Sequence, residues 1–263
     1  MPGRARSKVR HELMFHDLAK YFDLLASHKD YGAEANYLAR LVQKAGRSGG
    51  KDWLDVACGT GRHLEHLRRL YDVVGIDLSP EMLRIALGRL PGADLRRGDM
   101  RNFRLGREFD VVTCLFSAIG HLGSERELAV TFANFVRHLK PGGVAIVEPW
   151  LSPEMFRSCS VHLMTGQAPG LVVARLAFSR RRGNRSMIEY HYSIGEEGRG
   201  IQHFEETNVG LLVSPSRLVE LLKEAGLRAR FVKQGLTPGR GLLLGVKPKS
   251  ARAPESYTAL ALP

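Results

Sequence analysis

Residues 53–61 read WLDVACGTG, and this stretch decides the fold. Its apolar beginning predicts a buried strand that reaches Asp55 and the small residues behind it. Gly59 and Gly61 then predict a tight turn whose backbone approaches a ligand, because glycine lacks a Cβ and tolerates positive φ. A helical pattern follows across residues 62–70. The stretch is therefore interpreted as a strand, a tight turn and a helix beside a binding site.

A second apolar run, VVGID at residues 73–77, ends in Asp77. In doubly wound sheets, an acid at the end of the second strand holds ribose hydroxyl groups. The first turn departs from the GxGxxG pattern, since the position three after Gly61 is Leu64. The third glycine of that pattern helps to accommodate a pyrophosphate. We therefore expect a nucleoside cofactor without a diphosphate.

The rest of the chain alternates between predicted strands and helices, which indicates a parallel sheet covered on both faces. From residue 161 to 213 the apolar runs are short and separated by turn residues, which predicts three or four antiparallel strands. The predicted fold is α/β: a doubly wound, mostly parallel seven-stranded sheet with an N-terminal helical cap and an inserted antiparallel β-sheet. The expected core strands are 53–57, 73–77, 94–97, 109–116, 144–148, 228–233 and 242–246, and the longer helices are 32–45, 125–139 and 215–225.

The changes of pattern also predict the domain organisation. Disorder is expected for the basic residues 1–10 and for the tail, and a helical pattern starts at residue 11. The predicted segments are a basic arm and helical cap (1–50), a cofactor-binding core (51–157), an inserted substrate subdomain (158–213), the remainder of the core (214–248) and a tail (249–263).

The composition argues against several classes of protein. Cys58, Cys114 and Cys159 show no CxxC spacing, which disfavours a disulfide framework or a zinc site. His63 and His66 have a spacing that can bind a metal, but without an evident third ligand we expect solvated histidines and no metal. No apolar run approaches the ~18 residues of a membrane span, and no apolar stretch follows the basic N-terminus. A cytoplasmic protein is expected.

The net charge of +12 is the unusual feature of the composition. A basic surface favours anionic partners, whether nucleic acids, phosphorylated small molecules or acidic membranes, although it is equally consistent with a general basic bias. The arginine cluster at 180–182 and the N-terminal arm show no interleaved aromatic residues typical of RNA binding. Nucleic acid is therefore permitted by the charge but not favoured.

Together, the motifs resemble the S-adenosylmethionine-dependent methyltransferases of Rossmann-like fold. The resemblance runs in order through DVACGTG (55–61), GIDLSPEML (75–83), GDM (98–100), FDVV (109–112) and LKPGG (139–143). Longer segments are similar to the N,N-dimethyltransferases that act on nucleotide-linked 3-amino sugars. These segments are LDVACGTGRHLEHL, GDMRNFRLGREFDVV, FSAIGHL, VEPW and GRGLLLGV.

The resemblance implies a role for each matched residue around S-adenosylmethionine. Asp55 would fix the first loop or reach the methionine amino group, with simple loop capping as the alternative. Asp77 would accept the ribose hydroxyls, and Asp99 the adenine amino proton. The implied cofactor-binding residues are Tyr31, Asp55, Ala57, Cys58, Gly59, Gly61, Asp77, Leu78, Met82, Asp99, Met100 and Leu115.

Catalytic and acceptor-binding candidates lie after later strands. His121 follows the fourth strand, at the edge where ligands bind, and is the candidate general base, a capping or core histidine being the alternative. A cap tyrosine, Tyr21 or Tyr31, would close over the site unless it is core packing. The predicted catalytic residues are His121 and Tyr21, and the predicted substrate-binding residues are Glu148, Trp150, Arg175 and Arg240, the last as a diphosphate contact.

The predicted activity is methylation of the amine of a nucleotide-linked amino sugar by direct in-line transfer. Methyl transfer from a sulfonium to an amine depends mainly on holding the nitrogen in line with the departing sulfur. Three alternatives stay open: a glycine- or sarcosine-type N-methyltransferase, an RNA or protein methyltransferase, and a non-catalytic cofactor-binding protein. The expected partner is a small-molecule acceptor, with no membrane, and a homodimer is compatible with the sequence.

Overall fold

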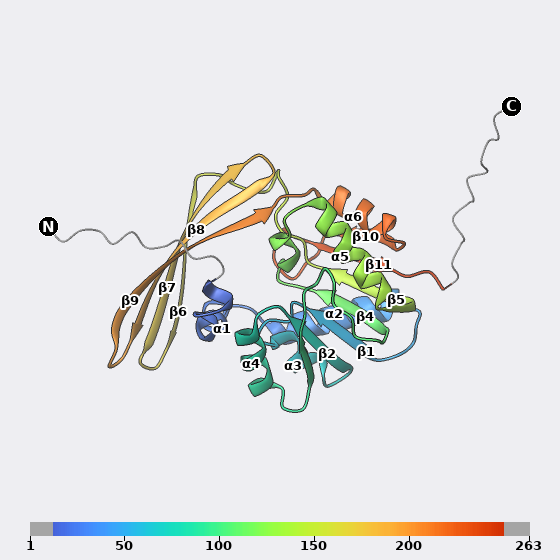
Figure 1. Ribbon diagram of the computed structural model, residues 1–263, viewed down its shortest axis with the longest axis horizontal. Coiled ribbons are helices and arrows are strands. Elements are labelled where there is room, and N and C mark those ends of the chain that lie inside the picture. The colour runs from blue at the N-terminus through green and yellow to red at the C-terminus, as the bar shows by residue number, and fades with distance from the viewer. Residues whose placement is uncertain (1–12, 250–263) are drawn as a thin grey trace.

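A computed structural model describes residues 13–249. Figure 1 shows an α/β core and a separate, elongated antiparallel sheet, with the short helix α1 between them. Disorder is predicted for residues 1–10 and for the tail, 249–263. These residues lie outside the described range, except residue 249. Among the described residues, no helix is long and apolar enough to cross a membrane.

The core is a seven-stranded sheet in the order β10-β11-β5-β4-β1-β2-β3. Only β11 runs antiparallel to its neighbours, β5 and β10, so the prediction of a mostly parallel sheet is confirmed. The strands are β1 (Asp52–Val56), β2 (Asp72–Asp77), β3 (Asp94–Arg97), β4 (Phe109–Cys114), β5 (Leu139–Val147), β10 (Arg228–Val232) and β11 (Leu242–Val246).

The strand order reverses between β1 and β4, and this reversal positions the site. From β1 the chain continues through β2 to β3 on one side, then returns to β4 and β5 on the other. Asp55 and Thr113 are register partners at this junction. In open α/β sheets, ligands bind beyond the carboxyl ends of the strands at such a switch point.

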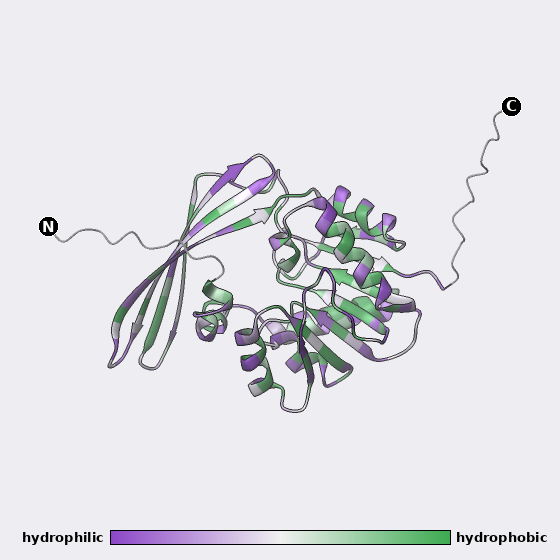
Figure 2. Cartoon of the chain, viewed as in Figure 1, coloured by the Kyte–Doolittle hydropathy of each residue, from purple (hydrophilic) through white to green (hydrophobic). Residues whose placement is uncertain are grey.

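Helices cover both faces of the core sheet, as Figure 1 shows, and hydrophobic residues are concentrated in its strands, which are largely green in Figure 2. One face packs against α2 (Tyr31–Ala45) and α3 (Arg62–Leu67), around the fully buried Trp53. The other packs against α5 (Glu125–Arg137) and α6 (Pro215–Glu224). A further helix, α4 (Pro80–Arg89), begins at Ser79, whose hydroxyl accepts a hydrogen bond from the Met82 amide.

The insertion is a four-stranded antiparallel sheet in the order β6-β7-β8-β9. Its inner face packs against three short N-terminal helices in an apolar cluster that includes Leu18, Leu25, Val173 and Ile194. This cluster fixes the sheet in front of the switch point. The elements are β6 (Ser160–Ala168), β7 (Leu171–Arg182), β8 (Arg185–Glu196) and β9 (Gly200–Leu211), with η1 (Leu13–Phe15), η2 (Ala19–Tyr21) and α1 (Phe22–Leu25).

Several boundaries differ from the sequence prediction; among them, β4 ends at Cys114, before the predicted residue 116, and α5 ends at Arg137, before the predicted residue 139. The N-terminal cap forms short 3₁₀ and α turns rather than one helix, and α3 ends at Leu67. Strand β5 begins at Leu139, before the predicted residue 144, because the chain passes an irregularity at Pro141 and Gly142 without leaving the sheet. Gly142 has φ +82°, a conformation that suits glycine.

Candidate functional site

A cavity of about 520 Å³ lies where the carboxyl ends of β1, β2 and β4 face the N-terminal helices and the antiparallel sheet. Volumes of ~300–1,000 Å³ are typical of small-molecule sites. Most predicted site residues meet here, although they come from distant parts of the chain. Those lining the cavity are Tyr31, Asp55, Ala57, Cys58, Gly59, Asp77, Leu78, Met82, Asp99, Met100, Leu115, His121, Trp150, Arg175 and Arg240.

The turn after β1 has the conformation that its glycines predict. Ala57, Gly59 and Gly61 all have positive φ, of 58°, 56° and 77°. A Cβ at Gly59 would meet nothing within 4 Å, so this backbone is open to a ligand. Gly61 instead starts α3 and lies against α4, where a Cβ would be 2.9 Å from Leu90. Gly61 is not among the residues that line the cavity, and its cofactor contact stays a prediction.

Asp77 joins the turns that follow β1 and β2. Its Oδ2 accepts a hydrogen bond from the Gly59 amide at 2.8 Å, and its Oδ1 accepts one from the Ser79 amide at 2.9 Å. Burial raises the pKa of this carboxyl above its ordinary value, and these amide donors oppose the rise. A carboxylate oxygen can accept two hydrogen bonds, so Asp77, which lines the cavity, has acceptor capacity for hydroxyl groups.

Asp55 is almost completely buried at the end of β1. Its Oδ1 accepts a hydrogen bond from the Thr113 hydroxyl at 2.7 Å, across the switch point. Burial raises the pKa of Asp55 to about 6, with His63 and Thr113 opposing the rise and Asp77 adding to it. Asp55 thus fixes the loop. Its negative charge is destabilised by burial, and a nearby cation would relieve this destabilisation.

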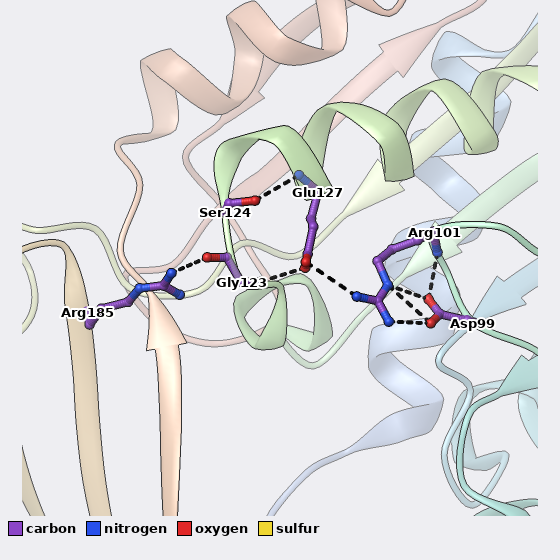
Figure 3. A network of polar contacts seen from close by, with 6 residues as sticks. All are labelled: Asp99, Arg101, Gly123, Ser124, Glu127 and Arg185. Carbon is purple, nitrogen blue, oxygen red and sulfur yellow. Dashed lines mark hydrogen bonds and ion pairs between the residues drawn. The ribbon is translucent and has the colours of Figure 1, made fainter.

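The adenine-side candidates are held by a polar network shown in Figure 3. Asp99 accepts two-point contacts from the Arg101 guanidinium, as close as 2.6 Å, which lowers the Asp99 pKa. Arg101 also contacts Glu127 at 3.4 Å. Glu127 accepts the Gly123 amide at 2.8 Å, and Arg185 donates to the carbonyl of the same glycine. The network thus connects the loop after β3 to the segment after His121 and to β8.

His121 ends a 3₁₀ turn, η3 (Ala118–His121), that follows β4. Its ring is exposed to the cavity and packs edge-on against Phe15, with 5.3 Å between ring centroids. The preceding Phe116 and Ser117 have φ values of 53° and 61°, which are unusual for residues other than glycine. Such strained backbone is concentrated at functional sites.

Besides Gly61, two of the predicted residues do not line the cavity. Tyr21 is buried in the cluster between the N-terminal helices and the antiparallel sheet, because its position in η2 faces that cluster. Glu148 is completely buried, and its Oε2 accepts the Phe116 amide at 2.7 Å. Tyr21 therefore acts as core, and Glu148 supports the strained backbone rather than facing the acceptor.

The acceptor side of the cavity carries two guanidinium groups. Arg240 lies 4.9 Å over the Trp150 ring and donates to the Ser117 hydroxyl at 2.8 Å. Burial lowers the Arg240 pKa, and Glu148 opposes that effect. Arg175 lies 4.8 Å over the Tyr190 ring, and its buried Nε has no hydrogen-bond partner among residues 13–249. The pair forms a positively charged wall with hydrogen-bonding capacity to spare.

Sequence reasoning missed several residues of the cavity wall. Glu206 is buried on β9, where it accepts a hydrogen bond from the Tyr192 hydroxyl at 2.5 Å. Phe15, Phe22 and Phe116 also line the cavity. The alternating pattern of residues 202–212 places Glu206 on one face of a strand. The pattern does not show which face of that strand turns toward the cavity. The missed wall residues are Phe15, Phe22, Lys29, Phe116, Tyr190, Tyr192, Glu206 and Asn208.

The solvated state predicted for His63 is wrong. Helix α2 packs over α3, so His63 is buried and contacts Glu34 at 2.7 Å. Lys29 contacts the other oxygen of Glu34, also at 2.7 Å. Within residues 13–249, no three His, Cys, Asp or Glu side chains are grouped as metal ligands.

Comparison with known proteins identifies the family. A family profile described as a methyltransferase domain matches residues 54–143. Over 88% of its length, the chain is 42% identical to dTDP-3-amino-3,4,6-trideoxy-alpha-D-glucopyranose N,N-dimethyltransferase of Streptomyces venezuelae, 98% of which is covered. The chain belongs to this methyltransferase family. The methyltransferase fold also matches the crystal structure of Streptomyces venezuelae DesVI, with TM-score 0.82, 40% identity, and 88% and 98% of the two chains covered.

A second solved structure supports the same assignment. It is SAM-bound CalS10, an amino pentose methyltransferase from Micromonospora echinaspora involved in calicheamicin biosynthesis. The match has TM-score 0.77 and 34% identity, and covers 92% of this methyltransferase and all of the CalS10 chain. The family resemblance found in the sequence motifs is thus confirmed.

Proposed function

We propose that this methyltransferase transfers a methyl group from S-adenosylmethionine to the amine of a nucleotide-linked amino sugar. The observation that supports the acceptor is the pair of guanidinium groups, Arg175 and Arg240, in the lining of the same cavity as the turns after β1 and β2. A planar guanidinium matches phosphate oxygens in two-point fashion. The relatives named above act on dTDP-linked or pentose amines, which fits the same wall.

The residues present fit an adenosyl sulfonium cofactor. The open backbone at Gly59 admits a close ligand, and the Asp77 carboxylate has acceptor capacity for a ribose diol. Leu78 and Met82 provide apolar surfaces beside Asp77, and Asp55 provides a carboxylate for an ammonium group. When bound, the cofactor supplies a methyl group whose bond to sulfur breaks, with both electrons staying on sulfur, as the amine lone pair forms the new N–C bond.

In this proposal His121 has the role of proton acceptor. Its imidazole faces the cavity, at the carboxyl end of β4. Histidine is the side chain that most often serves as a general base. It would take the proton that the methylated amine releases, while the protein holds the acceptor nitrogen in line. Positioning can supply most of the rate, so loss of His121 is expected to slow rather than abolish transfer.

The alternatives make different demands on the acceptor side. Glycine or sarcosine would need no diphosphate contact, so Arg175 and Arg240 would serve only to bind a carboxylate. A decisive assay mixes enzyme and S-adenosylmethionine with a thymidine-diphosphate 3-amino sugar, with glycine, with sarcosine and with tRNA, and measures methylated products by mass spectrometry. We expect product only from the sugar nucleotide. Product from glycine or tRNA instead would overturn the proposal.

The proposal also includes a homodimer formed through the outer face of the antiparallel sheet. Val161, Leu163 and Leu176 on that face are 62%, 69% and 46% exposed. Leu163 and Leu176 are register partners, so they form one apolar stripe. Exposed apolar stripes often mark protein interfaces. A second copy would cover the stripe, and Leu163→Lys should shift the sedimentation coefficient toward that of a monomer; a wild-type monomer would contradict the proposal.

A further inference from the structure

A row of four aromatic rings forms one part of the cavity wall. Phe116 lies 5.6 Å from Phe22, Phe22 lies 6.2 Å from Phe15, and Phe15 lies 5.3 Å from His121, between ring centroids. All four residues line the cavity. They come from η1, α1 and the segment after β4, which are brought together only by the fold. Below, these four rings are called the aromatic box.

The fold holds one ring of the box in an exposed and strained position. Phe116 directly follows β4 at the switch point and has φ +53°, which bulky residues rarely adopt. Its amide is held by Glu148 at 2.7 Å, a fully buried carboxylate. Its ring is nevertheless 41% exposed, toward the cavity. The buried acid and the strain thus serve to present an aromatic face to a ligand.

The faces of these rings favour cations. An aromatic ring carries a negative face that attracts ammonium groups within ~6 Å. The Phe116 ring already meets a cation, since Lys29 Nζ lies 4.8 Å from its centroid. The rings also present apolar surface, so an ammonium group that carries methyl groups can contact them through both its charge and its methyl groups.

We propose that Phe15, Phe22 and Phe116, together with the His121 imidazole, form a cation-binding box for the acceptor amine. The inference rests on the proposed function and deepens it. With each transfer the nitrogen gains a methyl group and a positive charge, then loses a proton before the next transfer. The box retains the once-methylated amine after the first transfer, so that the enzyme dimethylates its acceptor.

The first test measures binding without turnover. Enzyme saturated with S-adenosylhomocysteine is titrated calorimetrically with a thymidine-diphosphate 3-dimethylamino sugar and with the matching 3-hydroxy sugar. We expect the wild type to prefer the amine, and Phe22→Leu and Phe116→Leu each to reduce that preference about tenfold. Phe116→Tyr, which keeps the ring, should retain it. Phe178→Leu, whose ring lies on β7 outside the cavity under Arg180, is the matched control.

The second test measures product composition. With the primary amine as substrate, Phe22→Leu and Phe116→Leu should release monomethylated sugar where the wild type releases mostly dimethylated sugar. Unchanged product ratios together with an unchanged amine preference would overturn the aromatic box. Weaker binding of S-adenosylmethionine, with S-adenosylhomocysteine binding and the amine preference both unchanged, would also overturn it, because the rings would then hold the sulfonium. A wild type that methylates no amino sugar would instead contradict the proposed function.

Discussion

On the cofactor side of the cavity, functional groups lie at strand ends and in the short turns directly after them, whereas on the acceptor side they lie on long strands and a distant loop. The cofactor side comprises Asp55 and Asp77 at the ends of β1 and β2, the turns that follow these strands, and Asp99 in the turn after β3. The acceptor side comprises the inner face of the antiparallel sheet with Arg240, contributed by residues far apart in sequence. Local sequence specifies the first side, and long-range packing specifies the second. The two sides should therefore respond separately to substitution.

The largest effect is expected at Asp77. Asp77→Ala removes the acceptor for a ribose diol and for the Gly59 and Ser79 amides, and hydrogen bonds to charged groups contribute roughly 1.5–3 kcal/mol each. We expect S-adenosylhomocysteine affinity, measured by calorimetry, to fall by about 100-fold or more. Asp94→Ala on neighbouring β3, an exposed acid paired with Arg96, is the control. An affinity within threefold of wild type would remove the basis for a separate cofactor side.

A somewhat smaller effect is expected on the acceptor side. Arg240→Ala should raise the KM for the sugar nucleotide by about 30-fold, the loss of a two-point charged contact, while S-adenosylhomocysteine affinity stays constant. Arg240→Lys should fall between, because an ammonium cannot make the two-point contact. Arg180→Ala is the control, since Arg180 pairs with Glu189 and does not line the cavity. Equal losses of cofactor and acceptor binding would show that the two sides act as one.

The contrast between the sides also decides how much could be predicted from sequence. The mostly parallel seven-stranded sheet and the groups at the ends of β1 and β2 follow from local patterns, since strand ends meet at one sheet edge. Tyr21 and Glu148 could not be placed, because their directions depend on which face of a short turn or strand end packs inward. Glu206 was missed for the same reason. Arg240 was found only through its family motif, since its loop carries no periodic pattern.

A moderate effect is expected from the unusual pKa of Asp55. Its folded-state pKa of about 6 exceeds the ordinary value of ~4, so the folded apoenzyme binds the proton more tightly than the unfolded chain. The stability contributed by protonation is complete below pH ~4 and is lost as the pH rises through 6. Asp55→Asn should therefore stabilise the apoenzyme by about 1–2 kcal/mol at pH 8 and by almost nothing at pH 4.

The same substitution should weaken binding. Thermal melts at the two pH values measure the stability, and calorimetry at pH 8 measures S-adenosylhomocysteine affinity, which should fall because the charge that attracts the ammonium is gone. In the wild type, affinity should rise as the pH passes 6. Asp110→Asn, another buried acid but one whose pKa is lowered by Lys140, should instead destabilise at pH 8. Asp55→Asn melting below wild type at pH 8 would show that its charge stabilises the fold.

The smallest effect is expected in the network of Figure 3, the polar connection between the two sides. The Arg101 and Glu127 side chains are 42% and 36% exposed, and exposed ion pairs contribute only ~0.2–1 kcal/mol. A double-mutant cycle with Arg101→Met and Glu127→Gln should give a coupling of about 0.5 kcal/mol or less in unfolding free energy. Glu127→Gln keeps an oxygen for the Gly123 amide, so the loop after His121 should stay in place.

The informative readout for this network is cooperativity rather than stability. Cofactor binding can strengthen acceptor binding. If Glu127→Gln or Arg185→Ala abolishes that effect, then the network couples the cofactor side to the acceptor side. The quantity measured is the factor by which S-adenosylhomocysteine raises the affinity for the acceptor. We expect this factor to differ from the wild-type value by less than about twofold in both variants, because salt screens the interaction between exposed charges. Direct contact between the two ligands inside one cavity then accounts for any cooperativity, and the network serves only to hold the loop after His121.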